Sequence, residues 1–233
     1  MIDAQACCLP AAPLPALRVK EAPPFSVIGM DFAGPMFCSD FPNRKFYILI
    51  FTCAVVRAVH LELTESMNVD DFMLALRKFI CRRGLPSAIF SDNAKTFIAV
   101  SDRLLKFLGP NCPKFIRINP LSPWWGGWWE RLVRSVKAAL KKSIGKNMLC
   151  RKEVDTHLVE AEAHVNSRPL TVVGDGLDTL TPLTPAHFLI GRSFGLKPVV
   201  NMEQEVVTSE ILSDREKHRL QRLEVFWSVW SKN

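Results

Sequence analysis

Residues 58–93, AVHLELTESMNVDDFMLALRKFICRRGLPSAIFSDN, change their hydrophobic period twice and so decide the fold class. Alternating apolar side chains from Ala58 to Thr64 predict a strand. Asn68 then supplies a helix cap, and apolar residues recur every three or four positions until Gly84 ends the helix. A second short strand, Ser87 to Phe90, follows. A strand, a helix and a strand in this order indicate an α/β fold.

Two further strands are expected upstream. Phe25 to Pro35 is apolar on both faces, and Lys45 to Val56 is rich in β-branched and aromatic residues. Together with the strand at Ala58 to Thr64 they predict an antiparallel meander, because short connections join neighbouring strands. Residues 1–24 are rich in proline and alanine without a periodic apolar pattern, so we interpret them as a linker before the core.

Downstream of residue 93 the pattern predicts one more strand and several helices. The expected order is a short helix from Asp102 to Leu108, a strand from Lys114 to Ile118, and helices at about Trp129 to Ile144 and Lys152 to Ser167. Residues 170–186 read as loop. The domain prediction is a core over residues 25–191 and a truncated C-terminal segment over residues 192–233.

The C-terminal segment contains an amphipathic pattern. Leu220, Leu223, Trp227 and Trp230 fall at helical intervals among charged residues. A helix with such a stripe either docks on the core or binds a partner, and the sequence leaves both readings open.

Composition limits the class of protein. The chain has 233 residues, 48% of them hydrophobic, which fits one domain of ordinary size with flanking segments. Thirty Lys and Arg against 23 Asp and Glu give a net charge of +7, which favours polyanionic partners without establishing one. No secretory signal opens the chain, and the longest apolar run, Phe46 to Val56, is too short to span a membrane. We therefore expect a soluble intracellular protein.

The seven cysteines form no metal-binding pattern. They are scattered, and no pair has C-x-x-C spacing with histidines at zinc-finger distances. We expect reduced thiols and no zinc site. The cysteines are Cys7, Cys8, Cys38, Cys53, Cys81, Cys112 and Cys150.

Two aspartates, Asp31 and Asp92, lie on or just after predicted strands, where each could serve a functional site or an ordinary turn. Asp31 is flanked by apolar residues in FSVIGMDFAGP, residues 25–35, and a carboxylate there needs a partner or a metal to offset its lost hydration. An arginine or a nearby turn could equally satisfy it. Asp92 ends the strand Ser87 to Phe90, at the kind of strand end where α/β sheets place their sites, although S-D-N-A is also an ordinary turn.

Glu130 begins the long helix, directly after a loop rich in tryptophan and glycine. A first-turn glutamate also simply complements the helix dipole. Arg134, Lys137 and Lys141 follow at four, seven and eleven residues, so they share a helix face with Glu130. Such a stripe is commonly a solvated face, but with a carboxylate at its head it also suits a helix lying along a phosphate backbone.

The tryptophans Trp124, Trp125, Trp128 and Trp129 surround Gly126 and Gly127. At least two are expected in the core because of their large apolar area. The others, with Trp125 and Trp128 as candidates, are expected to line a DNA path or to stack on an unpaired base.

Together Asp31, Asp92 and Glu130 suggest a site for divalent cations. Magnesium or manganese prefers oxygen ligands, and two ions about 4 Å apart support in-line phosphodiester displacement. A strand-centre Asp, a strand-end Asp and a helical Glu can converge at one edge of a sheet.

Several blocks resemble the integrase core of Bel-Pao type long-terminal-repeat retrotransposons. They are GMDFAGP, residues 57–97, PWWGGWWERLVRSVKAALKK, NSRPLT at residues 166–171 and LTPAHFLIG at residues 183–191. The likeness covers about residues 15–191. The family pattern places some thirty-five residues between its second Asp and its Glu, and 130 − 92 − 1 = 37 residues intervene here.

The resemblance implies a ribonuclease-H-like fold: a mixed five-stranded sheet flanked by helices, with extra C-terminal helices. It implies Asp31, Asp92 and Glu130 as catalytic metal ligands for Mg²⁺ or Mn²⁺, with two ions bound alongside substrate. It also implies 3′-end processing of element DNA and strand transfer into target DNA, with the face of Arg134, Lys137 and Lys141 on the element end. Nuclear residence and a homo-oligomer in a full-length form follow from the same resemblance.

The sequence also departs from the family. Integrases of this kind have a zinc-binding His-His-Cys-Cys set upstream, whereas this chain has only Cys7 and Cys8 there. The tail HRLQRLEVFWSVW resembles the start of a longer C-terminal region. A truncated relic that binds nucleic acid or protein without catalysis is therefore the main alternative, and a host nuclease of the same fold is another.

Overall fold

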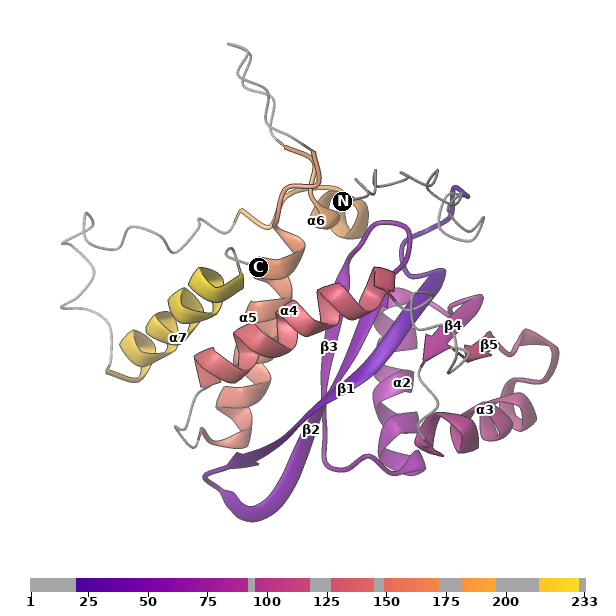
Figure 1. Ribbon diagram of the computed structural model, residues 1–233, viewed down its shortest axis with the longest axis horizontal. Coiled ribbons are helices and arrows are strands. Elements are labelled where there is room, and N and C mark those ends of the chain that lie inside the picture. The colour runs from indigo at the N-terminus through magenta and orange to yellow at the C-terminus, as the bar shows by residue number, and fades with distance from the viewer. Residues whose placement is uncertain are drawn as a thin grey trace, which may run out of the picture.

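The computed structural model describes residues 20–91, 95–117, 127–144, 149–171, 182–195 and 214–230. Its centre is a five-stranded mixed sheet in the order β3-β2-β1-β4-β5, with helices on both faces (Figure 1). β1 runs antiparallel to β2 and parallel to β4, so the meander continues into a parallel part. The strands are β1 (Val27–Cys38), β2 (Phe41–Cys53), β3 (Val59–Thr64), β4 (Ala88–Ser91) and β5 (Lys114–Arg117). The predicted ribonuclease-H-like fold class is confirmed.

The helices divide between the two faces of the sheet. On one face, α2 (Val69–Arg83) and α3 (Lys95–Leu108) cover a core rich in phenylalanine. On the other, α4 (Gly127–Ile144) and α5 (Arg151–Asn166) share a core with the sheet and with α7 (Asp214–Trp230). Figure 1 shows α4 crossing in front of the strands, with α7 beside it. Short elements, η1 (Gly109–Asn111) and α6 (Pro185–Ile190), complete the order.

β1 is apolar on both sides because it lies between these two layers. Val27 and Ala33 belong to the core under α4, whereas Ile28, Met30 and Phe32 belong to the core under α2 and α3. Since side chains alternate along a strand, the odd-numbered residues of this stretch face α4. Asp31 therefore lies on the α4 side of a central strand.

The outer strand β3 is protected by side chains of α5 instead of another strand. Asn166 accepts a hydrogen bond from the Val59 amide and donates one to the Val59 carbonyl, both at 2.8 Å. The Leu61 amide donates to Glu162 Oε2 at 3.0 Å. An exposed edge would leave these backbone groups open to pairing with another chain, and α5 closes them.

Several boundaries differ from the sequence-based prediction. α3 begins at Lys95 and not at residue 102, because Phe97 and Val100 continue the buried helical stripe that ends with Leu104. β1 continues past Pro35 to Cys38, with a register shift between Ala33 and Met36, and β2 begins at Phe41 and not at Lys45. Within the predicted loop 170–186, α6 already begins at Pro185.

The C-terminal helix docks on the core. α7 packs against α4 and α5, and Leu223 and Phe226 are 4% and 0% exposed. The docking reading of the amphipathic pattern is the one that the structure supports. Among the described residues, no helix is long and apolar enough to cross a membrane.

Candidate functional site

The first turn of α4 is fixed on β1 through a glycine and a tryptophan. A Cβ atom on Gly29 would lie 2.7 Å from Cγ of Trp129, so only glycine leaves room for this ring. Trp129 is 2% exposed, and its ring centroid lies 5.8 Å from that of Phe90 on β4. The sheet thereby sets the position of the residue after Trp129, which is Glu130.

Asp31 lies on the same face of β1, two residues after Gly29. Its side chain is 31% exposed, and Lys137 Nζ donates a hydrogen bond to its Oδ2 at 2.7 Å. The ammonium offsets part of the hydration that this carboxylate loses between strand and helix. Because the pair is only partly buried, Asp31 remains accessible to solvent.

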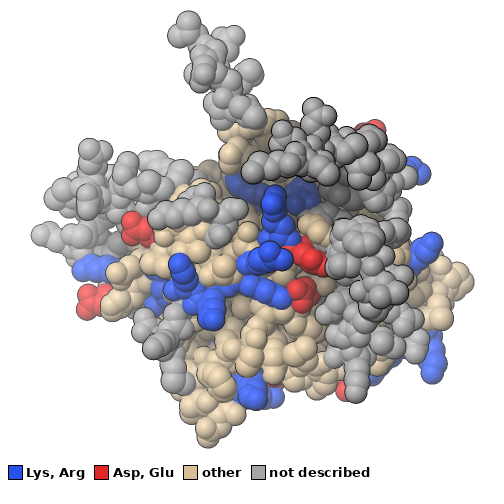
Figure 2. All heavy atoms as spheres, in the orientation of Figure 1, with Lys and Arg blue, Asp and Glu red and all other residues tan. Residues whose placement is uncertain are grey.

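The exposed side of α4 carries the predicted basic stripe. Glu130 and Lys137 are partly exposed, and Arg134 and Lys141 are exposed. Figure 2 shows Lys and Arg side chains gathered across the face that α4 occupies in Figure 1, with acidic side chains next to them. This face combines carboxylates with a strip of positive charge, an arrangement that suits a polyanion held beside oxygen ligands.

The structure brings together some of the predicted site residues and leaves others untested. Asp31 lies on the side of the sheet that α4 covers, Glu130 lies in the first turn of α4, and Lys137 donates a hydrogen bond to Asp31. Asp92 and Trp125 lie outside the described residues, as does the side chain of Trp128. Among the residues that are described, no group of three or more His, Cys, Asp or Glu is placed to hold a metal ion. The three-carboxylate site stays a prediction.

A second group of carboxylates lies inside the molecule, between β3, α2 and α5. His60 sits between Glu62 and Glu162, with nitrogen-to-oxygen distances of 3.1 Å to each. Burial opposes the charge of His60, but hydrogen bonds to Glu162 and Glu62 outweigh it and raise its pKa. Arg82 pairs with Glu62 at 2.9 Å and Arg83 pairs with Glu162. These carboxylates are bound by the protein itself, so we assign them a structural role.

Ser143 and His157 form a buried pair beneath α7. Their contact resembles that of a catalytic serine and its general base, but their burial indicates a structural role. Ser143 Oγ lies 2.8 Å from His157 Nε2, and the two residues are 5% and 1% exposed. Burial, with the charge of Arg222 and nearby His164, lowers the pKa of His157 to about 4. The Phe226 ring stands edge-on to this buried imidazole, so we assign the pair a structural role.

Sequence reasoning missed two features of this face. The Gly29–Trp129 contact was hidden because glycine gives no hydrophobic signal. The motif NSRPLT was noted only for its resemblance, whereas its Arg168 helps to line an arginine-rich pocket with Arg57 and Arg131. An arginine directly before a proline at a helix end was the available signal.

Comparison with known proteins places the fold. No family model matches the chain, and no curated protein sequence matches it. Among solved structures, a chain of the simian T-cell lymphotropic virus intasome in complex with PP2A regulatory subunit B56 gamma is 17% identical, with a TM-score of 0.54. That match covers 75% of this chain and 57% of that chain, so this chain spans less than two thirds of its length.

The integrase catalytic core domain of HTLV-2, in complex with magnesium, is also similar. Its trimeric form gives a TM-score of 0.51 at 17% identity, over 73% of this chain and 99% of that chain. Its dimeric form gives 0.50 at 17% identity, over 71% and 97%. At such identities the likeness establishes an integrase-like, ribonuclease-H-like fold.

Proposed function

We propose that this chain is the catalytic core of an Asp-Asp-Glu integrase, resembling those of Bel-Pao retrotransposons. It would cut and join DNA phosphodiester bonds in 3′-end processing and strand transfer. One observation carries the proposal: α4 begins on top of β1, so that Glu130 and a basic stripe lie on the side of the sheet that bears Asp31. The fold shared with viral integrase cores supports it.

The proposed metal ligands are Asp31, Asp92 and Glu130. Asp92 follows Ser91 in the sequence, and Ser91 is the last residue of β4, which pairs with β1. Carboxylate oxygens are the donors that Mg²⁺ and Mn²⁺ prefer, so the residue types fit the metal. When bound, two such ions would activate the attacking oxygen and stabilise the leaving one.

The remaining predicted residues would position DNA. Arg134 and Lys141 are exposed on α4 and would contact phosphates of the element end. Lys137, which holds Asp31 here, is long enough to turn to a phosphate as well. Trp125 and Trp128 are proposed to stack on bases. Target DNA and further copies of the chain are the other proposed partners, with a nuclear location.

The test is thermal melting with magnesium or manganese, followed by nicking of a labelled duplex. Metal should raise the melting temperature of the wild-type chain and should not raise that of Asp31→Asn or Glu130→Gln. Glu224→Gln is the matched control, because it removes an exposed carboxylate on α7, away from the site. Equal metal shifts in all four proteins would place the metal elsewhere and would overturn the assigned site.

A non-catalytic nucleic-acid-binding chain is the second candidate. The exposed Arg134 and Lys141 of α4 favour it, because a basic stripe binds a phosphate backbone whether or not a metal is bound. This candidate predicts salt-sensitive DNA binding that changes neither with metal nor with Asp31→Asn. Nicking that requires Asp31 would exclude it.

A further inference from the structure

A pocket of about 250 Å³ lies where α4, the β2–β3 turn, the end of α5 and the end of α7 meet. It has three guanidinium groups, one hydroxyl and apolar walls. None of the described residues that line it is acidic. These residues are Arg57, Arg131, Leu132, Ser135, Arg168, Leu170 and Trp230.

Arg168 is held in place by groups that do not neutralise it. Its Nη1 donates to the Val165 carbonyl at 2.7 Å, and its Nη2 donates to the Arg57 carbonyl at 2.5 Å. Its guanidinium carbon lies 5.9 Å from the centroid of the Trp230 ring. Arg57 has a left-handed backbone with φ of 60° and lies in the turn whose carbonyl accepts the hydrogen bond from Arg168. Backbone carbonyls and a ring fix this cation without supplying a negative charge.

The pocket therefore places the largely buried guanidinium of Arg168 beside two further guanidinium groups, those of Arg57, which is partly exposed, and Arg131, which is exposed. Burial lowers the pKa of Arg168 to about 10, and the charge of Arg57 adds to that effect. The group stays protonated at neutral pH. An anion between the guanidinium groups would offset their repulsion, and the apolar walls would strengthen that attraction. Arginine matches the oxygens of phosphate with paired hydrogen bonds, and Ser135 offers one more donor.

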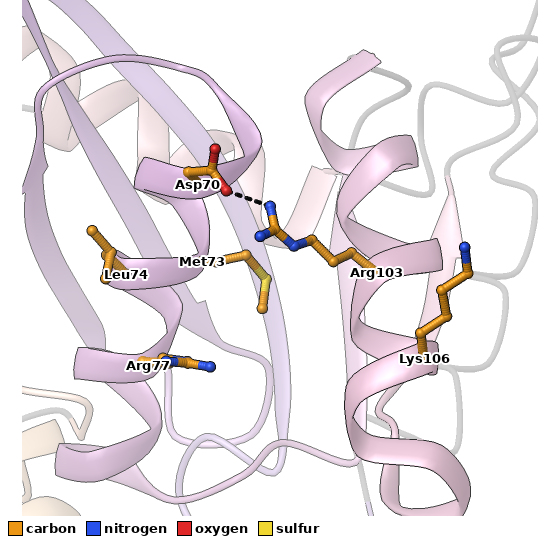
Figure 3. Close-up of a pocket in the computed structure, with 6 residues that line it drawn as sticks. All are labelled: Asp70, Met73, Leu74, Arg77, Arg103 and Lys106. Carbon is orange, nitrogen blue, oxygen red and sulfur yellow. Dashed lines mark hydrogen bonds and ion pairs between the residues drawn. The ribbon is translucent and has the colours of Figure 1, made fainter.

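A larger cavity on the other side of the sheet makes a useful contrast. It has about 490 Å³ and lies between α2 and α3. There Arg103 reaches across from α3 and pairs with Asp70 of α2 (Figure 3). Lys106 also lines this cavity. An anion entering it would compete with a carboxylate that is already in place.

We infer that the pocket of Arg57, Arg131 and Arg168 binds a phosphate group, either of a nucleic-acid backbone or as the free ion. Arg131 lies in the first turn of α4, next to Glu130 in the sequence, so the pocket is near the start of the helix that carries the proposed metal ligand. In its nucleic-acid form the inference rests on the proposed function.

Arg131 is the residue to change, because it is exposed and its loss leaves the Arg168 contacts intact. Duplex affinity is measured by fluorescence anisotropy over a range of salt, with a chelator present. We expect Arg131→Gln to lower the slope of log K against log salt by about one. Arg131→Lys should keep most of the slope because it keeps the charge. Lys106→Gln, the matched control in the other cavity, should leave the slope unchanged.

A second arm separates the two sources of phosphate. Inorganic phosphate is titrated during thermal melting, against chloride at equal ionic strength. A rise in melting temperature that Arg131→Gln loses, with unaltered DNA slopes, would assign the site to the free ion. If Arg131→Gln behaves like Lys106→Gln in both arms, the inference is wrong. Because no divalent metal is present, these results are independent of whether the Asp31 site binds one.

Discussion

Two groups of carboxylates, one inside the molecule and one on the α4 face, show how the same residue type serves different ends. Glu62 and Glu162 have side chains only 6% and 11% exposed, whereas that of Asp31 is 31% exposed. The interior pair is enclosed by histidine and arginine partners. Asp31 accepts a bond from Lys137 through Oδ2 and still faces solvent. Enclosure by the protein marks a structural carboxylate, and an open side marks one that can receive a ligand.

The interior group couples three elements of the fold. Glu162 on α5 accepts the Leu61 amide of β3, lies 3.1 Å from His60 and pairs with Arg83 of α2. Burial alone would raise the pKa of Glu162, but His60, the Leu61 amide and Arg83 together lower it. The charge of this carboxylate is therefore part of the folded state.

Removing one carboxylate from each group tests most directly whether the interior group is structural and the Asp31 site is not. Glu162→Ala leaves His60, Arg83 and the Leu61 amide without their acceptor, so we expect unfolding free energy to fall by about 3–5 kcal/mol. Asp31→Asn should change it by less than about 1 kcal/mol, since its pair is partly exposed. Urea denaturation measures both. Similar losses in the two variants would show that the Asp31 site is structural too.

The pH dependence of stability sharpens the same contrast for the interior. His157 has a folded pKa of about 4 against an ordinary 6.5, because burial disfavours its charge. Below pH 6.5, His157 is protonated in the unfolded chain but stays neutral in the folded chain. The free energy of unfolding therefore decreases as the pH falls from 6.5 towards 4. The loss should reach about 3 kcal/mol at most.

His157→Gln, measured by urea denaturation at several pH values, should flatten this dependence. His60 contributes in the opposite sense, since its pKa is raised. Its stabilisation is complete below 6.5 and declines as pH rises through the folded value. An unchanged acid limb in His157→Gln would mean that another group causes the loss.

Much of the fold was predictable because each element carries its own period. The apolar pattern on both sides of Val27 to Phe32 located a central strand, and the stripe after Trp129 located α4. Periodicity reports burial within an element and not which elements meet. The pairing of Lys137 with Asp31, 106 residues apart, and the cover that α5 gives β3 were therefore out of reach.

The three-carboxylate site itself stays a prediction. Residue type and order singled out Asp31 and Glu130, and the structure places both on the α4 side of the sheet. The arginine pocket escaped because its members come from four segments and share no local pattern. When tertiary packing brings charged residues together from distant segments, no local sequence pattern indicates their proximity.

The smallest expected effect tests what Lys137 does for Asp31. Lys137→Gln should change unfolding free energy by under about 1 kcal/mol, because both side chains are about one-third exposed. If the ammonium competes with metal for Oδ2, its removal should raise apparent metal affinity about twofold to fivefold, which is what a pair of that strength is worth. Metal titration during thermal melting measures this, with Lys141→Gln as the control on the same stripe. A weaker metal response in Lys137→Gln would mean that the lysine positions Asp31 for the metal instead of competing with it for Oδ2.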